Sequence, residues 1–199
     1  MASVFPIVEG QGDVIAVPLL LRRIAVELIG GINLQCATPF RLPRTRLKNI
    51  GDLSRALQLG QNKLRQVPPP SFILILMDAD VDCPKALLET LAGQHRDLIA
   101  ASPTSMVFAA REFETWFLAA DMNASDHRAL RASTPPVANP EMIADAKGRF
   151  RDDFMLPGSS YSETVDQPKF ASCMDLAKAR RSPSFDKLVR EVRRHLGPR

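Results

Sequence analysis

The stretch Phe72-Ile73-Leu74-Ile75-Leu76-Met77, followed directly by Asp78-Ala79-Asp80-Val81-Asp82, decides the fold class of this chain. A continuous apolar run of this length is typical of a parallel strand that is covered on both faces. Pro84 follows soon after the last acid and suits the first turn of a helix. We therefore expect a central parallel strand that ends in three aspartates and leads into a helix.

Strand-like and helix-like segments alternate on either side of this stretch. Strands are expected over residues 4–8, 34–40 and 105–109, and helices over residues 13–28, 52–65, 84–92 and 112–120. Pro18 is awkward inside the first helix, because proline lacks an N–H and clashes with the preceding turn. Regular helix is therefore expected only from about Val17. The alternation predicts an α/β fold with a mostly parallel sheet flanked by helices.

Residues 121–199 differ from the first 120 residues, because loops rich in proline and glycine separate short helical segments. The loop signals are Pro135-Pro136, Asn139-Pro140 and Pro157-Gly158, and helices are expected over residues 141–150, 170–180 and 184–196. We expect an α/β core over residues 1–120 and a C-terminal helical extension over residues 121–199, packed together as one structural unit.

The composition of the chain is that of a globular protein without a membrane span. The chain has 199 residues, of which 45% are hydrophobic and 24% are charged, as in an ordinary globular protein. The longest apolar run covers residues 14–21, whereas a membrane span needs about 20 residues. The first ten residues also lack the positive start of a secretory signal. We therefore expect a cytoplasmic protein that does not enter a membrane.

Cysteine and histidine are too few and too scattered to suggest a metal cage. Three cysteines at wide spacings fit reduced thiols, and the three histidines lie far apart. Any metal is therefore expected to be held by carboxylates. The net charge of +4 supports a nucleic-acid partner only weakly. Basic clusters within residues 41–48 and 178–199 suit either solvated helix faces or a polyanion.

Acidic residues follow two of the expected strands. Glu9 comes after the first strand, and Asp78, Asp80 and Asp82 come after the central one. Because the carboxyl ends of parallel strands meet in one crevice, we expect these acids to converge. Residues i and i+2 of an extended chain point to the same side, which lets Asp78 and Asp80 hold one cation with Asp82 in reach. Oxygen ligands favour Mg²⁺ or Mn²⁺. We expect substrate phosphates to complete the coordination of the ion, and Glu9 to accept or donate a proton.

Each motif alone also has a simpler interpretation. A D-x-D sequence occurs in solvated turns before helices, and V-E-G is short enough to occur by chance. The order of the two motifs, and their placement at the ends of two expected strands, favours the shared site.

Six segments, spread over most of the chain, carry a family resemblance: VEGQGD from Val8 to Asp13, AVPLLLRRI from Ala16 to Ile24, DADVDCP from Asp78 to Pro84, REFETWFLA from Arg111 to Ala119, TVDQP from Thr164 to Pro168, and RRSPSFDKL from Arg180 to Leu188. The order strand, Glu-Gly, helix and then strand, D-x-D resembles the Toprim domain. That domain is the metal-dependent phosphoryl-transfer module of topoisomerases, primases and nucleases related to the OLD family. More closely, the whole set resembles a family of small bacterial Toprim-like proteins known only as a domain of unknown function. The resemblance implies a Toprim/Rossmann-like sheet.

The resemblance also implies roles for individual residues. Glu9 corresponds to the general acid/base, and Asp78 and Asp80 correspond to metal ligands. The chain departs from the family pattern at Gln11, where histidine is common, and at Asp13, where glutamate is common. Asp13 keeps the charge on a shorter arm, so we expect it beside the ligands, and it also suits the N-cap of the first helix.

Further charged residues are expected around the same crevice. Glu112 and Glu114 follow the last expected strand, where they either join the site or simply suit the start of a helix. Glu114 is the stronger candidate for a metal ligand. Guanidinium groups match phosphate geometry, so substrate contacts are expected from Arg44, Arg46 and Arg111.

Two segments outside the acidic motifs have open roles. Asp166 and Gln167 either close over the metal site or hold the extension onto the core. Trp116 and Phe117 are expected in the core rather than as a platform on which bases stack.

The leading hypothesis for function is Mg²⁺-dependent phosphodiester hydrolysis by a nuclease. Topoisomerase chemistry needs a positioned tyrosine and a clamp, and the one tyrosine, Tyr161, lies in a loop-like segment. Primase activity needs further domains. Toprim nucleases often act with an ATPase of the AAA or ABC type, and this chain lacks the G-x-x-x-x-G-K-[ST] loop, so any ATPase is a separate partner.

Two alternatives remain open. The chain could be a non-catalytic interaction module of a larger complex, or a phosphohydrolase that acts on a small molecule. A shallow basic groove would favour nucleic acid, and a deep closed pocket would favour the small molecule.

Overall fold

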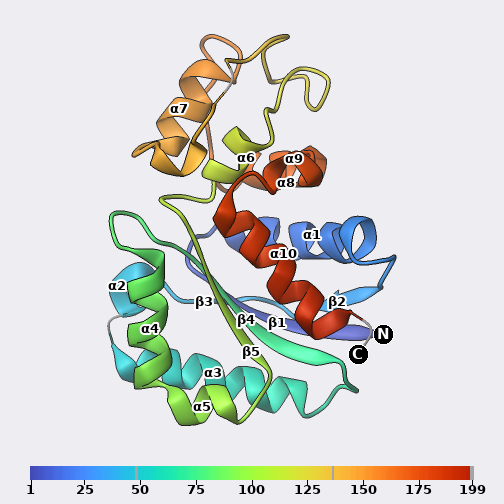
Figure 1. Ribbon diagram of the computed structural model, residues 1–199, viewed down its shortest axis with the longest axis vertical. Coiled ribbons are helices and arrows are strands. Elements are labelled where there is room, and N and C mark those ends of the chain that lie inside the picture. Colours follow the sequence, from blue (N-terminus) through green and yellow to red (C-terminus); the bar gives the residue numbers. More distant parts are fainter. Residues whose placement is uncertain (48, 136, 198–199) are drawn as a thin grey trace.

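The computed structural model describes residues 1–47, 49–135 and 137–197 as a parallel sheet between two layers of helices (Figure 1). Part of the C-terminal extension lies beyond one end of the sheet, and its last helix joins one of the two layers. Lys48 of the basic cluster, Pro136 of an expected loop, and Pro198 with Arg199 lie outside the described residues. In the described part, no helix has both the length and the apolar character that crossing a membrane requires.

The sheet contains β1 (Ala2–Val8), β2 (Leu34–Cys36), β3 (Phe40–Arg41), β4 (Ser71–Asp78) and β5 (Thr104–Ala109). The strand order is β2-β1-β4-β5, and every pair of strands is parallel. The short β3 also pairs with β1, at the C-terminal end of that strand. This confirms the expected α/β class and the central position of β4. The single strand expected over residues 34–40 is wrong, because β2 and β3 pair with successive parts of β1.

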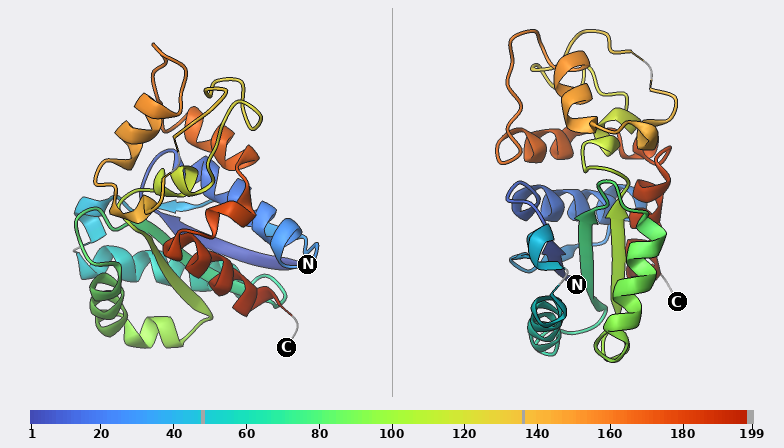
Figure 2. Two further views of the ribbon diagram at one scale, coloured as in Figure 1. Left: turned by 45° about the horizontal axis from the view of Figure 1, so that its top comes forward. Right: turned by 90° about the vertical axis from the view of Figure 1, so that its left-hand side faces the viewer.

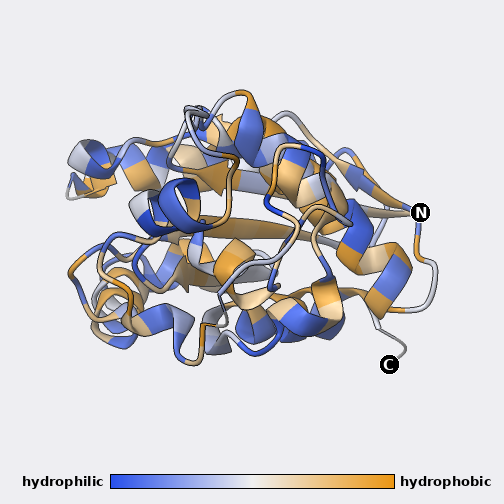
Figure 3. Ribbon diagram, turned by 90° about the horizontal axis from the view of Figure 1, so that it is seen from above, coloured by the Kyte–Doolittle hydropathy of each residue, from blue (hydrophilic) through white to orange (hydrophobic). Residues whose placement is uncertain are grey.

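Alternate residues of the buried strands face opposite helical layers, as the two-residue period of a strand requires. Phe72, Leu74 and Leu76 join one hydrophobic cluster, and Ile73 and Ile75 join the other. Figure 3 shows hydrophobic strands in the middle of the molecule, between helices of mixed hydropathy. The sheet therefore holds both halves of the core in a fixed relation.

The first helix, α1 (Asp13–Arg23), begins earlier than expected and continues as a π-helix, η1 (Ile24–Leu28). The expectation that Pro18 delays regular helix to about Val17 is wrong, since Pro18 lies buried inside α1. Burial of the neighbouring residues Val17, Leu20 and Leu21 offsets the hydrogen bond that a proline cannot donate.

The opposite layer contains α3 (Ile50–Leu64), α4 (Pro84–Gln94) and α5 (Arg96–Ala100), and the short α2 (Arg44–Leu47) precedes α3. The helix expected over residues 112–120 is shorter than predicted, as α6 (Thr115–Ala119). Trp116 and Phe117 of α6 are fully buried, which confirms that they belong to the core.

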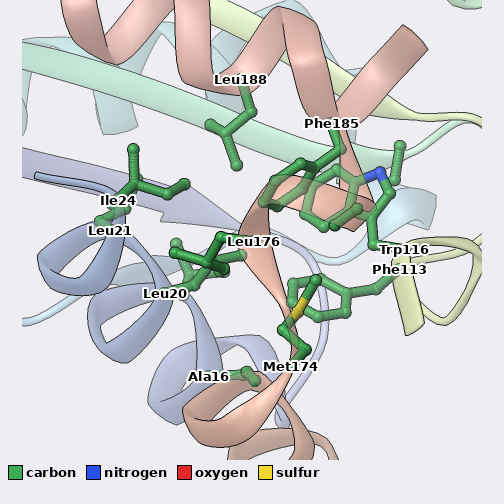
Figure 4. Packing of buried hydrophobic residues seen from close by; sticks show 14 of the residues in the cluster. Ala16, Leu20, Leu21, Ile24, Phe113, Trp116, Met174, Leu176, Phe185 and Leu188 are labelled. Carbon is green, nitrogen blue, oxygen red and sulfur yellow. The ribbon is translucent and has the colours of Figure 1, made fainter. Parts of the chain in front are cut away.

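The extension contains a 3₁₀ turn, η2 (Pro140–Met142), and the helices α7 (Ala146–Asp153), α8 (Asp166–Cys173), α9 (Leu176–Ala179) and α10 (Pro183–Leu196). Its α8 packs against α1, and α10 packs against β5 and η1. Figure 4 shows Leu20 of α1 beside Leu176 of the extension, with Phe185 and Leu188 of α10 in the same cluster. Most of residues 121–165 lies beyond the carboxyl ends of β4 and β5 in both views of Figure 2.

Candidate functional site

The segments that follow β4 and β5 are joined by their backbones. The Ala79 amide donates to the Ala109 carbonyl at 2.8 Å, and the Asp80 amide donates to the Arg111 carbonyl at 2.9 Å. Asp80 and Arg111 both have positive φ angles, 49° and 68°, which are uncommon for residues other than glycine. Backbone strain of this kind persists where surrounding contacts enforce it, and it gathers at functional sites.

Five carboxyl groups come together at this end of the sheet, and we name them the carboxyl-end cluster: Glu9, Asp13, Asp78, Asp80 and Glu114. Burial raises the pKa of Asp78 well above its usual value of 3.8. The other four members add to this shift through their negative charges. Such mutual repulsion is costly unless protons or a cation neutralise the charge.

Glu9 lies directly after β1, and one of its carboxylate oxygens, Oε2, is buried without a hydrogen-bond partner among the described residues. Burial raises the pKa of Glu9 from its usual 4.5 to about 7, and the charges of Asp80 and Asp13 add to the shift. The positive charge of Arg44 opposes it. A buried oxygen without a partner is unusual in native proteins, and a proton, an ordered water, an ion or a ligand group can each satisfy it.

Glu114 immediately precedes α6, and its residue is only 2% exposed. The Tyr161 hydroxyl donates a hydrogen bond of 2.7 Å to Glu114 Oε1. Burial nevertheless raises the pKa of Glu114 from 4.5 to about 7. The side chain that the sequence predicts as a metal ligand is therefore held in place by a residue of the extension.

Asp13 fixes the turn between β1 and α1. Its Oδ2 accepts from the Gly10 amide at 2.8 Å, and its Oδ1 accepts from Gln167 Nε2 at 3.0 Å. The prediction that Asp13 caps α1 is wrong, because Gly12 precedes the helix and Asp13 is its first residue. Burial raises the pKa of Asp13, and these hydrogen bonds oppose the shift.

Gly12 allows the extension to approach this turn. A Cβ atom at Gly12 would lie 2.1 Å from Gln167 Oε1 and 2.5 Å from the Glu163 carbonyl oxygen. Gln167 is 4% exposed, and its Oε1 is the second buried side-chain atom without a partner among the described residues. The contact between Gln167 and Asp13 therefore requires a glycine at position 12.

Arg44 contacts the three aspartates at the end of β4 and in the loop after it. Its guanidinium donates to the Asp78 carbonyl at 2.9 Å and to Asp82 Oδ2 at 2.5 Å, and it lies 3.7 Å from Asp80 Oδ2. Arg111 contacts the same loop through a hydrogen bond of 3.3 Å to the Asp80 carbonyl. Two of the three arginines expected to bind substrate thus border the cluster, and Asp82 is paired with one of them.

Other predicted residues lie outside the cluster. Arg46 pairs with Asp52 at 2.6 Å, on the surface. Glu112 accepts from the Lys147 amide at 2.8 Å. Asp166 accepts from the Ser162 amide at 2.8 Å and pairs with Lys169 at 3.1 Å at the start of α8. Each of these side chains holds local structure together.

Three residues near the cluster were not predicted from the sequence to belong to the site. Tyr161 contacts Glu114, Lys147 pairs with Glu163, and the Glu163 carbonyl faces Gly12. All three lie in the extension, between or beside loops. No spacing rule links them to acids more than thirty residues away in the chain.

Carboxylate oxygens are the type of ligand that hard divalent cations prefer. Within the described ranges, no group of three or more histidine, cysteine, aspartate or glutamate side chains is arranged so that it could hold a metal ion. Mg²⁺ commonly binds only one or two carboxylates, together with water and substrate phosphates. The unpartnered Glu9 oxygen and the repelling carboxyl groups are the features that a cation would neutralise.

Sequence comparison places the chain in a family. No curated protein and no solved structure is significantly similar to it. A family model described as a domain of unknown function, DUF4276, matches residues 8–193 and so spans the cluster, the sheet and most of the extension. The chain therefore belongs to the DUF4276 family.

Proposed function

We propose that this protein is a Mg²⁺- or Mn²⁺-dependent phosphodiesterase, and specifically a nuclease that acts with a separate ATPase. The observation that carries the proposal is the buried Glu9 Oε2 atom, which has no partner among the described residues, at a place where Glu9 and three further carboxyl groups surround Asp78. This arrangement suits a site that awaits a cation and a substrate.

Asp78 and Asp80 are the residues that would hold the cation, because they follow the central strand where the carboxyl ends meet. The bound ion would polarise a phosphoryl oxygen and help to supply a reactive water. Glu114 is the candidate for a further ligand, and Tyr161 holds its Oε1 in place.

Glu9 is the candidate for moving a proton. A pKa of about 7 keeps both the protonated and ionised forms populated near neutral pH, where general acid–base catalysis is most effective. Its unpartnered Oε2 is free of competing hydrogen bonds within the described structure. Glu9 can therefore accept a proton from a nucleophile or return one to a leaving group.

Arg44 and Arg111 are the candidates for contacting phosphate. Both border the loop after β4, and a planar guanidinium matches two phosphate oxygens at once. Arg41 lies on the same rim, where it donates to the Glu9 carbonyl at 3.2 Å. A negatively charged substrate would thus meet positive side chains close to the acids.

The order of these motifs along the parallel sheet also supports a relationship to Toprim domains and OLD-family nucleases. Such a relationship favours a nucleic acid as substrate. It also favours an AAA or ABC ATPase as a partner, because this chain has no phosphate-binding G-x-x-x-x-G-K-[ST] loop of its own.

Calorimetry with Mn²⁺ and cleavage assays with single- and double-stranded DNA and RNA test the proposal. Asp80→Asn is expected to abolish both metal binding and cleavage. Asp52→Asn is the matched control, since Asp52 pairs with Arg46 away from the cluster and its loss should change neither. A wild-type protein that binds no divalent cation contradicts the proposal. Metal binding without cleavage of any substrate, with or without a neighbouring ATPase, would favour an interaction module.

A further inference from the structure

A groove with a volume of about 370 Å³ opens beside the loop that follows β4. It lies between α2 and α4, and it ends at Arg44 and Asp82. Small-molecule sites usually measure roughly 300–1,000 Å³, so this groove suits one small group rather than a long segment of chain.

The walls of the groove are mostly apolar. Leu47 and Leu91 are almost fully buried and belong to the hydrophobic cluster under the sheet, and Leu87 packs against that cluster. Ala86 is an exposed lining residue with a minimal side chain, which leaves the groove open. A flat apolar group is therefore suited to this space.

Two polar residues also line the groove. Thr90 and Gln94 are four positions apart in α4, so they project from the same side of the helix. Both side chains are exposed, so their polar groups are accessible from the groove. They offer a hydroxyl and an amide, which can donate to and accept from the polar edge of a ring.

Arg44 connects the groove to the carboxyl-end cluster. Arg44 lines the groove and also contacts Asp78, Asp80 and Asp82. A molecule with a phosphate at Arg44 can therefore extend its remaining part along α4 between Leu47 and Leu87.

We propose that this groove binds the nucleoside of the nucleotide whose phosphate lies at the carboxyl-end cluster. This inference rests on the proposed function. The base would lie between the apolar walls, with its polar edge toward Thr90 and Gln94. The site then recognises one nucleoside beside the reacting phosphate, in addition to contacting the phosphate backbone.

Calorimetry in the presence of Ca²⁺, which replaces Mg²⁺ to limit turnover, tests this inference with defined probes. The wild type is titrated with adenosine 5′-monophosphate, thymidine 5′-monophosphate, ribose 5-phosphate and inorganic phosphate. At least one nucleotide is expected to bind about tenfold more tightly than ribose 5-phosphate, because only the nucleotide buries a base. This comparison needs no variant.

Ala86→Trp fills the groove and is expected to reduce nucleotide affinity to that of ribose 5-phosphate, with Ca²⁺ binding unchanged. Ala100→Trp is the matched control, because Ala100 is also an exposed helical alanine but does not line the groove. Circular dichroism verifies that both variants fold.

Equal affinities of the wild type for both nucleotides and for ribose 5-phosphate overturn the nucleoside site but leave the metal-dependent chemistry standing. A nucleotide preference that survives in folded Ala86→Trp likewise overturns it. Absence of both Ca²⁺ and phosphate binding in the wild type overturns the proposed function, and this inference with it.

Discussion

Two polar clusters lie at opposite ends of the sheet. They differ in whether all their buried polar atoms have hydrogen-bond partners. The amino-end cluster consists of Ser105 near the start of β5, with Glu191, Arg194 and His195 of α10. Ser105 Oγ donates to Glu191 Oε2 at 2.8 Å and lies 2.8 Å from His195 Nε2. The His195 ring stacks on Phe72 with the ring centroids 4.4 Å apart. Within the described residues, none of these four side chains has a buried polar atom without a partner.

The comparison separates polar groups that are fully hydrogen-bonded from groups whose charge and hydrogen-bonding capacity are not fully matched. Serine, histidine and glutamate together suggest a hydrolase, but here the glutamate accepts from the serine rather than orienting the histidine. The amino-end cluster is therefore a closed network that ties α10 to β5. The carboxyl-end cluster instead has an unpartnered oxygen, repelling carboxyl groups and positive φ angles. Residue type alone does not distinguish the two.

The largest difference is expected in cleavage. Glu9→Gln should lower the rate of phosphodiester cleavage by about 10²–10⁴-fold, the usual contribution of a general acid or base, with Mn²⁺ binding retained. Ser105→Ala at the other end should leave the rate unchanged. Steady-state assays of both variants measure this, and wild-type activity in Glu9→Gln would remove Glu9 from the mechanism.

Metal affinity should show the next largest difference. Asp78→Asn should weaken Mn²⁺ binding by at least about 100-fold, since loss of even an outer-shell partner often costs 10–100-fold. The same change should raise the melting temperature of the metal-free protein, because a neutral amide ends the repulsion with neighbouring carboxylates. Calorimetry and thermal melts in EDTA provide the two readings. Unchanged Mn²⁺ affinity would show that Asp78 is not a ligand.

At the amino end, the expected effect is on stability alone. His195→Ala should reduce the free energy of unfolding by about 1–3 kcal/mol, because it removes a hydrogen bond to buried Ser105 and the stacking on Phe72. Mn²⁺ affinity should not change. Urea denaturation measures the loss, and a concurrent drop in metal affinity would contradict the separation of the two clusters.

The last expected effect is a pH dependence of stability that has opposite sign at the two ends. In the folded state Glu9 and Glu114 have pKa values of about 7, above their usual 4.5, so the folded protein retains protons that the unfolded chain releases. Their contribution to stability is thus present below about pH 4.5 and is lost as pH rises through 7. Burial lowers the pKa of His195, so its contribution falls as pH drops below 6.5.

Urea denaturation in EDTA between pH 5 and 8 (about the range where these groups titrate) checks the sign. Glu114→Gln should flatten the fall in stability toward high pH, and His195→Phe should leave that fall intact. A divalent cation should also flatten it, because the ion neutralises the ionised carboxylates. Stability that rises from pH 5 to 8 in EDTA would contradict the shifted pKa values.

Much of the sheet was predictable from sequence because strand signals are local. The apolar run at Phe72–Met77 and the acids after it indicated β4, and the parallel arrangement predicted that Glu9 and Asp78 would converge. The early start of α1 was missed because tertiary burial outweighs the local penalty of Pro18.

The residues that hydrogen-bond to the carboxyl groups of the candidate site were harder to predict. Tyr161 contacts Glu114 across 47 positions of sequence. Gln167, for which the sequence left two roles open, contacts Asp13 across 154 positions. Their positions depend on how loops of the extension fold back, and a single sequence carries no periodic signal for that. The partners of Arg44 were likewise hidden, because an arginine that pairs with aspartates looks the same in sequence as one that waits for phosphate.

The contact between Gln167 and Asp13 has a consequence for the order in which the protein is made. A ribosome synthesises β1, β4 and their acids long before α8, so a nascent chain carries the carboxylates without the segment that closes over the β1–α1 turn. The cluster reaches its final form only after residue 167 has emerged and folded back. The contact between Gln167 and Asp13 therefore forms only after most of the chain has been synthesised.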